Sequence, residues 1–204
     1  MSTFNILRSA FMSGICIGIA GFGFLALKSS GDFLAGCIIF AFALISVICY
    51  KLRLYTGTAG FIAKNEVGLM LLVLLGNIIG CATMGVFTRL SPMPLQETAQ
   101  ALLQSRLDLG LVNGGLLAIG CGFIMTTAVT FARKGNNLPM LFGVPLFIVC
   151  GFPHSIADAN FNSCAPLDYR CANLGSIQPF YGVIVVGNFV GCNFYRWVMG
   201  GNPE

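Results

Sequence analysis

A short motif that occurs twice, each time inside an apolar segment long enough to cross a bilayer, constrains this chain most. Residues 75–81 read LGNIIGC, and residues 186–192 in the second half read VGNFVGC. Two glycines four residues apart let helix backbones approach closely in a bilayer, and both copies place an amide side chain between them. Matched motifs in two halves indicate a duplicated architecture, and duplicated halves with a site between them are a transport design.

The composition places the chain in a membrane. Of its 204 residues 56% are hydrophobic and only 9% are charged, compared with about a quarter charged in soluble domains. The mean hydropathy is +0.85. Six apolar stretches are candidate spans, at residues 8–27, 33–50, 67–88, 110–132, 138–153 and 177–199. We therefore predict an all-α membrane protein with six transmembrane helices, of which the second and fifth are short.

The six stretches fall into two groups of three. We predict one transmembrane domain over residues 1–204, with repeat one at about 8–90 and repeat two at about 109–199. Residues 91–108 join the repeats and begin with prolines. Four apolar residues in this linker fall at helical spacing: Leu95, Ala99, Leu102 and Leu103. The pattern predicts a short amphipathic helix that lies at the outer surface of the membrane.

The second and fifth stretches both run into polar sequence. Residues 50–60 read YKLRLYTGTAG, and residues 150–158 read CGFPHSIAD. Irregular backbone at bilayer depth is tolerated only where protein buries it or where it lines a wet cavity. Pro153 lacks a backbone donor and breaks the helix. Interrupted segments at matched positions of two halves indicate the binding site of a transporter.

These interruptions supply the candidate site residues. His154 is the only histidine, and an ionisable side chain in a bilayer is costly and usually functional. We predict that it lines the pathway instead of being a satisfied core residue. Thr56 and Thr58 either line the pathway, which we favour, or bond their own backbone around the break. Asp158 either caps or pairs within the half-helix that follows His154.

Basic residues set the predicted orientation. With a cytoplasmic N-terminus, the inside carries Arg8, Lys64, Arg133, Lys134 and Arg196. The outside carries Lys28, Arg89, Arg106 and Arg170, partly offset by acidic residues. This bias follows the positive-inside rule, and six spans place both termini in the cytoplasm. The net charge of +4 fits such a protein and requires no nucleic-acid partner.

The nine cysteines do not indicate a disulfide scaffold, because seven lie in apolar segments, where cysteine is a small hydrophobic residue. Cys164 and Cys171 lie in the polar stretch 162–171 on the predicted outer face. An oxidising compartment permits a disulfide there, and the spacing leaves both a disulfide and two free thiols open. The sequence contains no C-x-x-C pair, histidine cluster or carboxylate cluster, so we predict neither a metal site nor a cofactor.

The motifs carry a family resemblance. Residues 151–158, GFPHSIAD, resemble the G-F-E-H-S-I-A-N signature of the formate/nitrite transporter family, and residues 54–58, LYTGT, resemble its L-F-T-S-T element. The resemblance covers about residues 8–199. It implies an aquaporin-like bundle of six helices in two inverted three-helix repeats, with the second and fifth helices broken. It also implies a homopentamer with one pore per protomer and passage of small monovalent anions.

The resemblance assigns roles residue by residue. His154 matches the central pore histidine, Thr56 matches its threonine partner, and Arg106 falls close to a vestibule lysine. Five residues fall at positions that resemble two hydrophobic constrictions: Phe40, Leu44, Leu54, Tyr55 and Phe147. The chain departs from the family pattern at two places in the signature. Pro153 replaces its glutamate and Asp158 replaces its asparagine.

Further departures lie outside the signature. Arg53 stands where an acidic residue is common in the family, and Gly122 stands near the position of a pore asparagine. These departures bear on the substrate more than on the existence of a pore.

We therefore predict a channel or transporter in a bacterial inner membrane, with the bilayer, a proton and a small anion as partners. Formate, nitrite, hydrosulfide and short monocarboxylates are the candidate anions. Protonation near His154, whose unperturbed pKa is close to physiological pH, would carry the anion past the constrictions. The alternative is a channel for a neutral solute such as water, ammonia or urea. A membrane thiol oxidoreductase is disfavoured, because no haem or quinone ligand set is recognisable.

Overall fold

The computed structural model describes residues 2–201, apart from the side chain of Lys64. That side chain contributes to the predicted orientation, and residues 1 and 202–204 belong to the predicted domain; all lie outside the described part. In chain order the elements are α1 (Thr3–Ser29), α2 (Phe33–Cys49), α3 (Tyr55–Ala59), the 3-10 helix η1 (Lys64–Glu66), α4 (Val67–Leu90), α5 (Leu95–Leu107), α6 (Gly110–Arg133), α7 (Leu138–Val149), α8 (Ser155–Cys164), α9 (Leu167–Ala172) and α10 (Leu174–Met199).

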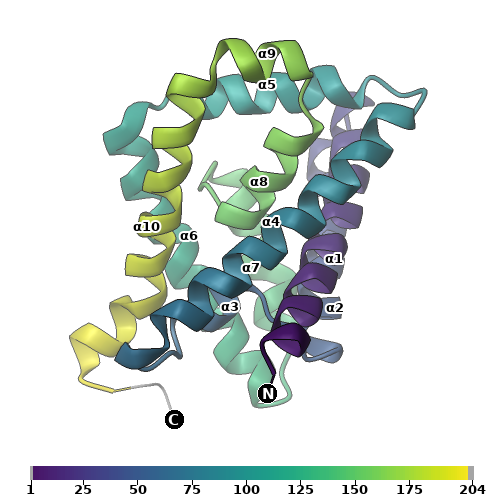
Figure 1. The fold of residues 1–204 in the computed structure, drawn as a ribbon. Helices are drawn as coiled ribbons and strands as arrows, with labels where there is room; N and C mark the ends of the chain where they lie inside the picture. The colour runs from purple at the N-terminus through teal and green to yellow at the C-terminus, as the bar shows by residue number, and fades with distance from the viewer. Residues whose placement is uncertain (1, 202–204) are drawn as a thin grey trace.

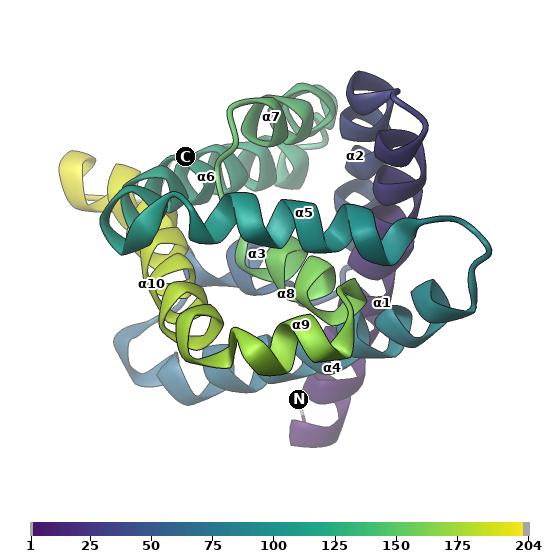
Figure 2. The same ribbon diagram turned by 90° about the horizontal axis from the view of Figure 1, so that it is seen from above.

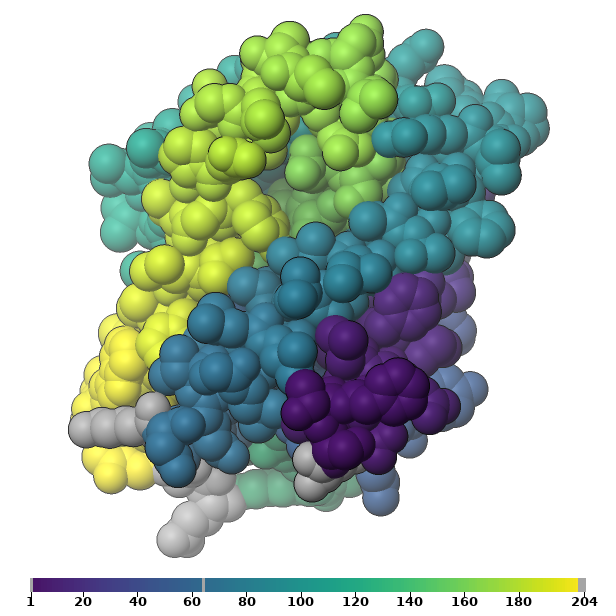
Figure 3. Space-filling view, viewed as in Figure 1, coloured from purple at the N-terminus to yellow at the C-terminus, as the bar shows by residue number. Residues whose placement is uncertain are grey.

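Four helices, α1, α4, α6 and α10, are long and apolar enough to cross a membrane, whereas α2 and α7 are shorter apolar helices. Both termini lie at one end of the molecule, and α5 and α9 lie across the opposite end (Figure 1). Seen from above, α3 and α8 lie in the middle, enclosed by the other helices (Figure 2). In the space-filling view, residues of α8 are visible between α4 and α10 (Figure 3).

The linker between the two halves contains the predicted helix. α5 begins directly after Pro94, and its buried residues are Leu95, Ala99 and Leu103. These positions recur at helical spacing and face the bundle, so one side of α5 covers the interior while the other is polar. Leu102, also predicted for this face, is partly buried.

The polar stretch 162–171 differs from the expectation. α8 continues to Cys164, and a further short helix, α9, follows where the sequence indicated only a polar segment. Both thiols are free: Cys164 is buried and Cys171 is exposed. The sulfur of Cys164 lies 3.1 Å from the hydroxyl of Thr88 on α4. The disulfide alternative is therefore excluded in this structure.

Glycines of the doubled motif bring helices into close contact within the protomer. A Cβ at Gly80 of α4 would overlap the backbone carbonyl of Phe11 in α1. A Cβ at Gly191 of α10 would overlap the carbonyl of Ile119 in α6. Small residues permit this approach in lipid, where helix association depends on packing. The two copies of the motif therefore hold α1 to α4 and α6 to α10.

The chain leaves α2 and α7 by the same turn. In each case two successive amides bond back to the last turn of the helix, and the first of the two residues is left-handed. Lys51 has φ 53° and Gly151 has φ 70°. The bonds are Lys51 N to Ile48 O (2.9 Å) and Leu52 N to Val47 O (2.8 Å), and Gly151 N to Ile148 O (3.0 Å) and Phe152 N to Phe147 O (2.9 Å). This turn satisfies carbonyls that a helix end leaves unpaired, and it ends α7 at Val149, before the predicted 153.

Candidate pore site

A cavity enters the bundle from each end. The α5-side cavity has a volume of about 200 Å³, and its lining includes Lys28, Phe40, Arg106, Phe147, His154 and Asp158. The termini-side cavity has a volume of about 690 Å³, and its lining includes Leu44, Lys51, Arg53, Leu54, Glu66 and Arg133. Each cavity thus combines charged side chains with apolar side chains from the middle of the bundle.

Four of the five apolar residues expected at the constrictions lie in an apolar layer in the middle of the bundle, between the two cavities. Phe40 and Leu44 lie on α2, Leu54 directly precedes α3, and Phe147 lies on α7. Each of the four is at most 2% exposed. Phe40 and Phe147 border the α5-side cavity, whereas Leu44 and Leu54 border the termini-side cavity. The structure therefore separates them into two apolar pairs, one facing each cavity.

Tyr55 is placed differently from these four. It is 1% exposed and lines neither cavity among the described residues. Its hydroxyl donates to the carbonyl of Val185 on α10 at 3.0 Å. A buried phenol needs such a partner, and this bond fixes α3 against α10. The Tyr55 side chain thus holds α3 in place without facing either cavity.

His154 and Thr56 come together from opposite halves of the chain. The imidazole Nε2 lies 3.0 Å from Thr56 Oγ1. The other ring nitrogen, Nδ1, accepts a hydrogen bond from the Ala157 amide at 3.2 Å and so caps α8. Because Nδ1 is an acceptor, the neutral ring carries its proton on Nε2 and donates it to Thr56. The ring is also stacked on Phe147, with centroids 5.4 Å apart.

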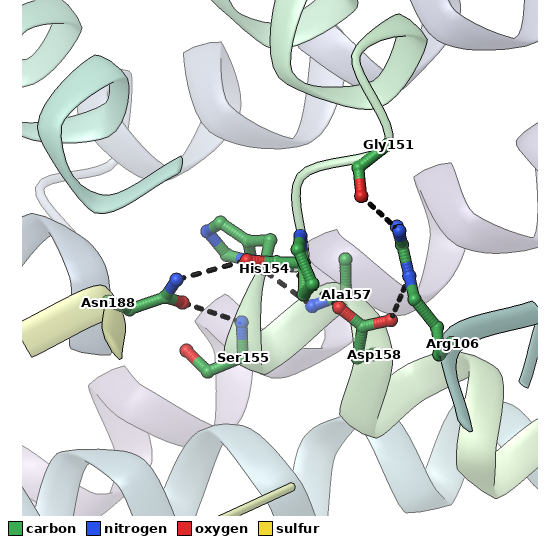
Figure 4. Close-up of polar contacts among 8 residues, drawn as sticks. Arg106, Gly151, His154, Ser155, Ala157, Asp158 and Asn188 are labelled. Carbon is green, nitrogen blue, oxygen red and sulfur yellow. Dashed lines mark hydrogen bonds and ion pairs between the residues drawn. The ribbon is translucent and has the colours of Figure 1, made fainter. Parts of the chain in front are cut away.

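An asparagine holds the backbone on both sides of His154 (Figure 4). The Oδ1 atom of Asn188, on α10, accepts from the Ser155 amide at 2.7 Å. Its Nδ2 donates to the carbonyls of Pro153 at 3.0 Å and Ala118 at 2.8 Å. The first amides of a helix have no partner within the helix, so this fully buried side chain satisfies groups that the break leaves unpaired.

Asn77 does the same at the other break. On α4, its Oδ1 accepts from the Tyr55 amide at 2.8 Å. Its Nδ2 donates to the carbonyls of Arg53 at 2.9 Å and Ala10 at 2.8 Å. The amide of each G-N-x-x-G motif therefore clamps the start of one central helix. The sequence displayed both asparagines, but only the fold connects them to the interruptions.

Arg106 reaches from α5 into the α5-side cavity, where it pairs with Asp158. The Nε–Oδ1 distance is 3.1 Å, and the two side chains are 15% and 7% exposed. Arg106 also donates to the carbonyl of Gly151, and Asp158 Oδ2 accepts from the His154 amide at 2.7 Å. Asp158, which the sequence left between capping and pairing, does both. The pair ties the surface helix to the loop that carries His154.

Membrane-length apolar helices around an interior that opens toward both ends define a multi-pass membrane transport protein. The family model described as "Formate/nitrite transporter" matches residues 1–199. The chain belongs to this family. It is therefore a transport protein and not an enzyme.

Solved structures with the same fold were found. One is a pentameric formate channel with formate bound, with a TM-score of 0.80, 18% sequence identity and 97% coverage of both chains. Another is an FNT family ion channel, with a TM-score of 0.77, 17% identity, and coverage of 98% of this chain and 91% of the other. No match to a curated protein sequence was found.

Proposed function

We propose that the chain forms a pore for small monovalent anions of weak acids, such as formate, nitrite, hydrosulfide or a short monocarboxylate. One observation carries the proposal: cavities from both ends stop at an apolar layer that contains the hydrogen-bonded pair of His154 and Thr56. The family of the chain and its likeness to a formate channel support the same class of passenger.

The apolar layer sets the main barrier to an anion. A bare charge that crosses it loses most of its hydration, at a cost of many kcal/mol, whereas the neutral acid crosses far more easily. Lys28, Arg106 and Asp158 border the α5-side cavity, and the one net positive charge among these three raises the local anion concentration. Desolvation makes the anion more basic, so it takes up a proton at the edge of the layer. Arg106 acts here as the vestibule cation, held by Asp158.

His154 could either donate a proton to the passenger or only hydrogen-bond it, and the geometry of the ring favours the hydrogen bond. A second ring proton would have to occupy Nδ1, which already accepts the Ala157 amide. The neutral ring instead presents Nε2–H beside Thr56. We infer that His154 and Thr56 hydrogen-bond the passenger while it crosses, and that water in the cavities supplies the proton.

We further propose that α2 with α3, and α7 with α8, are the two halves of interrupted second and fifth spans in an inverted repeat. The matched turns after α2 and α7 support this, as do the equivalent clamps of Asn77 and Asn188. The last residue of each doubled motif adds a link between halves. The Cys81 thiol lies 3.5 Å from the carbonyl of Ile156, and the Cys192 thiol lies 3.4 Å from that of Thr56.

Assembly and orientation belong to the same proposal. A homopentamer is supported by the similarity to a pentameric channel, and mass measurement of the particle in nanodiscs tests it; a monomer or tetramer would contradict it. Both termini lie at the same end (Figure 1), and the ends of α6 and α10 carry the basic residues Arg133, Lys134 and Arg196. We place this end in the cytoplasm of a bacterium, with the inner membrane around the helices. Labelling of a C-terminal tag in intact cells would test the orientation.

Flux into proteoliposomes tests the function. Formate, nitrite, hydrosulfide, acetate and lactate are compared at several external pH values, with water and urea in parallel. We expect weak-acid flux that rises as the external pH falls, because a larger fraction of the anion is then protonated. Flux of water or urea alone, without dependence on pH, would favour the neutral-solute channel and contradict the proposal.

Variants of His154 test its role. His154→Asn retains a hydrogen-bond donor and removes the titratable ring, so we expect a folded protein with measurable flux and the parent pH dependence. His154→Phe retains an aromatic ring and removes the hydrogen bond, so flux should fall by about two- to tenfold, the size of one hydrogen bond between neutral groups. Thr56→Val should lower flux in the same direction, while Thr130→Val, whose hydroxyl bonds its own helix, serves as the matched control. Loss of pH dependence in His154→Asn would assign the proton to the ring instead.

A further inference from the structure

The two turns that leave α2 and α7 differ in one informative residue. Gly151 occupies the left-handed position after α7, where glycine is the residue without a steric penalty. Lys51 occupies the equivalent position after α2, with φ 53° and the same pair of backbone hydrogen bonds. A residue with a Cβ is strained there, and such strain is characteristic of functional sites. A glycine would build the turn, so the lysine side chain itself is the feature that requires an explanation.

Lys51 lines the termini-side cavity together with other basic residues. The lining includes Arg53 and Arg133, and Glu66 is the acidic residue among the described ones. One oxygen of Glu66 already accepts the Ala63 amide at 2.9 Å. The balance of charge among these described residues is therefore positive: the turn after α2 and the end of α6 supply the basic groups, and η1 supplies the single acidic one.

The Arg133 guanidinium and the backbone that carries Lys51 are held in place before any ligand arrives. The guanidinium of Arg133 lies 3.7 Å from the ring centroid of Phe61, which lines the same cavity. The loop that carries Lys51 is fixed at Arg53, whose amide donates to Ser9 Oγ at 3.0 Å and whose carbonyl accepts from Asn77. Groups that are already ordered lose little conformational entropy on binding.

The opposite cavity has a different balance. There Arg106 is paired with Asp158 at 3.1 Å, and Lys28 lies 4.7 Å from the ring centroid of Phe33. Its volume is about 200 Å³, compared with about 690 Å³ on the termini side. The termini-side cavity is thus both larger and more strongly cationic than one small monovalent anion requires.

We propose that the termini-side cavity binds a compact polyvalent oxyanion of the phosphate type, and that this ligand closes the pore from that side. Several cationic groups around one space match the several charged oxygens of such an ion. A polyvalent anion cannot be neutralised by a single proton, so it cannot cross the apolar layer and remains in the cavity. The blocking step rests on the proposed pore function; the binding step does not.

Direct binding is measured with pyrophosphate by titration calorimetry on the full chain in nanodiscs. The wild-type chain should bind, with an affinity that falls as salt is raised. Lys51→Gly and Arg133→Gln should each weaken binding by about tenfold, the scale of one charge-assisted hydrogen bond. Lys51→Gly matches the backbone of Gly151, so its fold should survive, and Arg133→Gln leaves the strained turn untouched.

Two control variants test whether pyrophosphate binding depends on the positive charge within the termini-side cavity. Lys134→Gln removes the same charge at the same end of the molecule but outside this cavity, and should bind as the wild type does. Lys51→Arg retains the charge and should bind within about twofold of the wild type. No binding by the wild type, equal losses in Lys134→Gln and Lys51→Gly, or a loss in Lys51→Arg as large as in Lys51→Gly would each overturn the proposal.

Block is then measured as weak-acid flux into vesicles of known protein orientation. Pyrophosphate on the termini side should inhibit flux, pyrophosphate on the α5 side should not, and Lys51→Gly should relieve the inhibition. Equal block from both sides, or flux insensitive to bound pyrophosphate, would overturn the blocking step. Binding without any weak-acid flux would remove the proposed function and leave the site, whereas flux without binding would remove the site and leave the function.

Discussion

Replacing Asn188 by leucine should destabilise the protein more than the small change in side-chain volume suggests. Leucine has a similar volume, and the site is fully buried. The substitution removes the acceptor of the Ser155 amide and the donor to the Pro153 carbonyl, bonds of 2.7 and 3.0 Å. The Ser155 amide lies in the first turn of α8, so the helix offers it no other partner.

The size of the effect follows from the two groups that lose their partners, the Ser155 amide and the Pro153 carbonyl. A buried polar group left without a partner costs about 1–3 kcal/mol, and water cannot replace the asparagine in the closed layer. Two groups together give a loss of about 2–6 kcal/mol, a large part of the about 5–15 kcal/mol typical of a folded domain. Because the two groups flank His154, transport should also fall.

The free energy of unfolding in mixed micelles, with flux measured on the same preparations, is the assay. Val186→Leu, on an exposed position of the same helix, is the control and should leave both unchanged. Asn77→Leu should lose a similar amount, since its bonds to Tyr55 and Arg53 are equivalent. An Asn188→Leu protein within about 0.5 kcal/mol of the parent, the scale of an ordinary surface substitution, would refute the clamp.

Three further substitutions or probes have defined outcomes. Gly191→Ala should lower the melting temperature clearly because its Cβ would overlap the facing carbonyl of α6, whereas Gly182→Ala, with no atom within 4 Å, should be neutral or stabilising by up to about 1 kcal/mol. Asp158→Asn should cost about 1–3 kcal/mol of unfolding free energy, since an amide has one acceptor oxygen where the carboxylate has two, so either Arg106 or the His154 amide loses its partner; an unchanged value would mean that water in the cavity replaces the lost acceptor. A maleimide should label exposed Cys171 and spare buried Cys164 without prior reduction; labelling of Cys171 only after reduction would restore the disulfide alternative.

The sequence by itself determined the class of the protein and the two places where irregular backbone separates α2 from α3 and α7 from α8. Long runs of apolar residues are not stable in water, so they place the chain in a membrane. In lipid, the backbone groups must be hydrogen-bonded within helices. Polar residues, Pro153 and glycines at matched points of two halves therefore predicted irregular backbone there. His154 and Thr56 were recognisable as candidate site residues because polar side chains at that depth are costly.

Only the tertiary structure decided which of these groups meet. Thr56 and His154 lie in different halves, and their contact depends on how the halves pack. The same holds for Asn188, which clamps a loop far away in sequence, and for Asp158, whose partner Arg106 comes from the linker helix. Periodicity and composition describe neighbours along one helix, whereas a hydrogen bond between helices depends on their relative position and rotation. That position is set here by glycines such as Gly191, where the backbones touch.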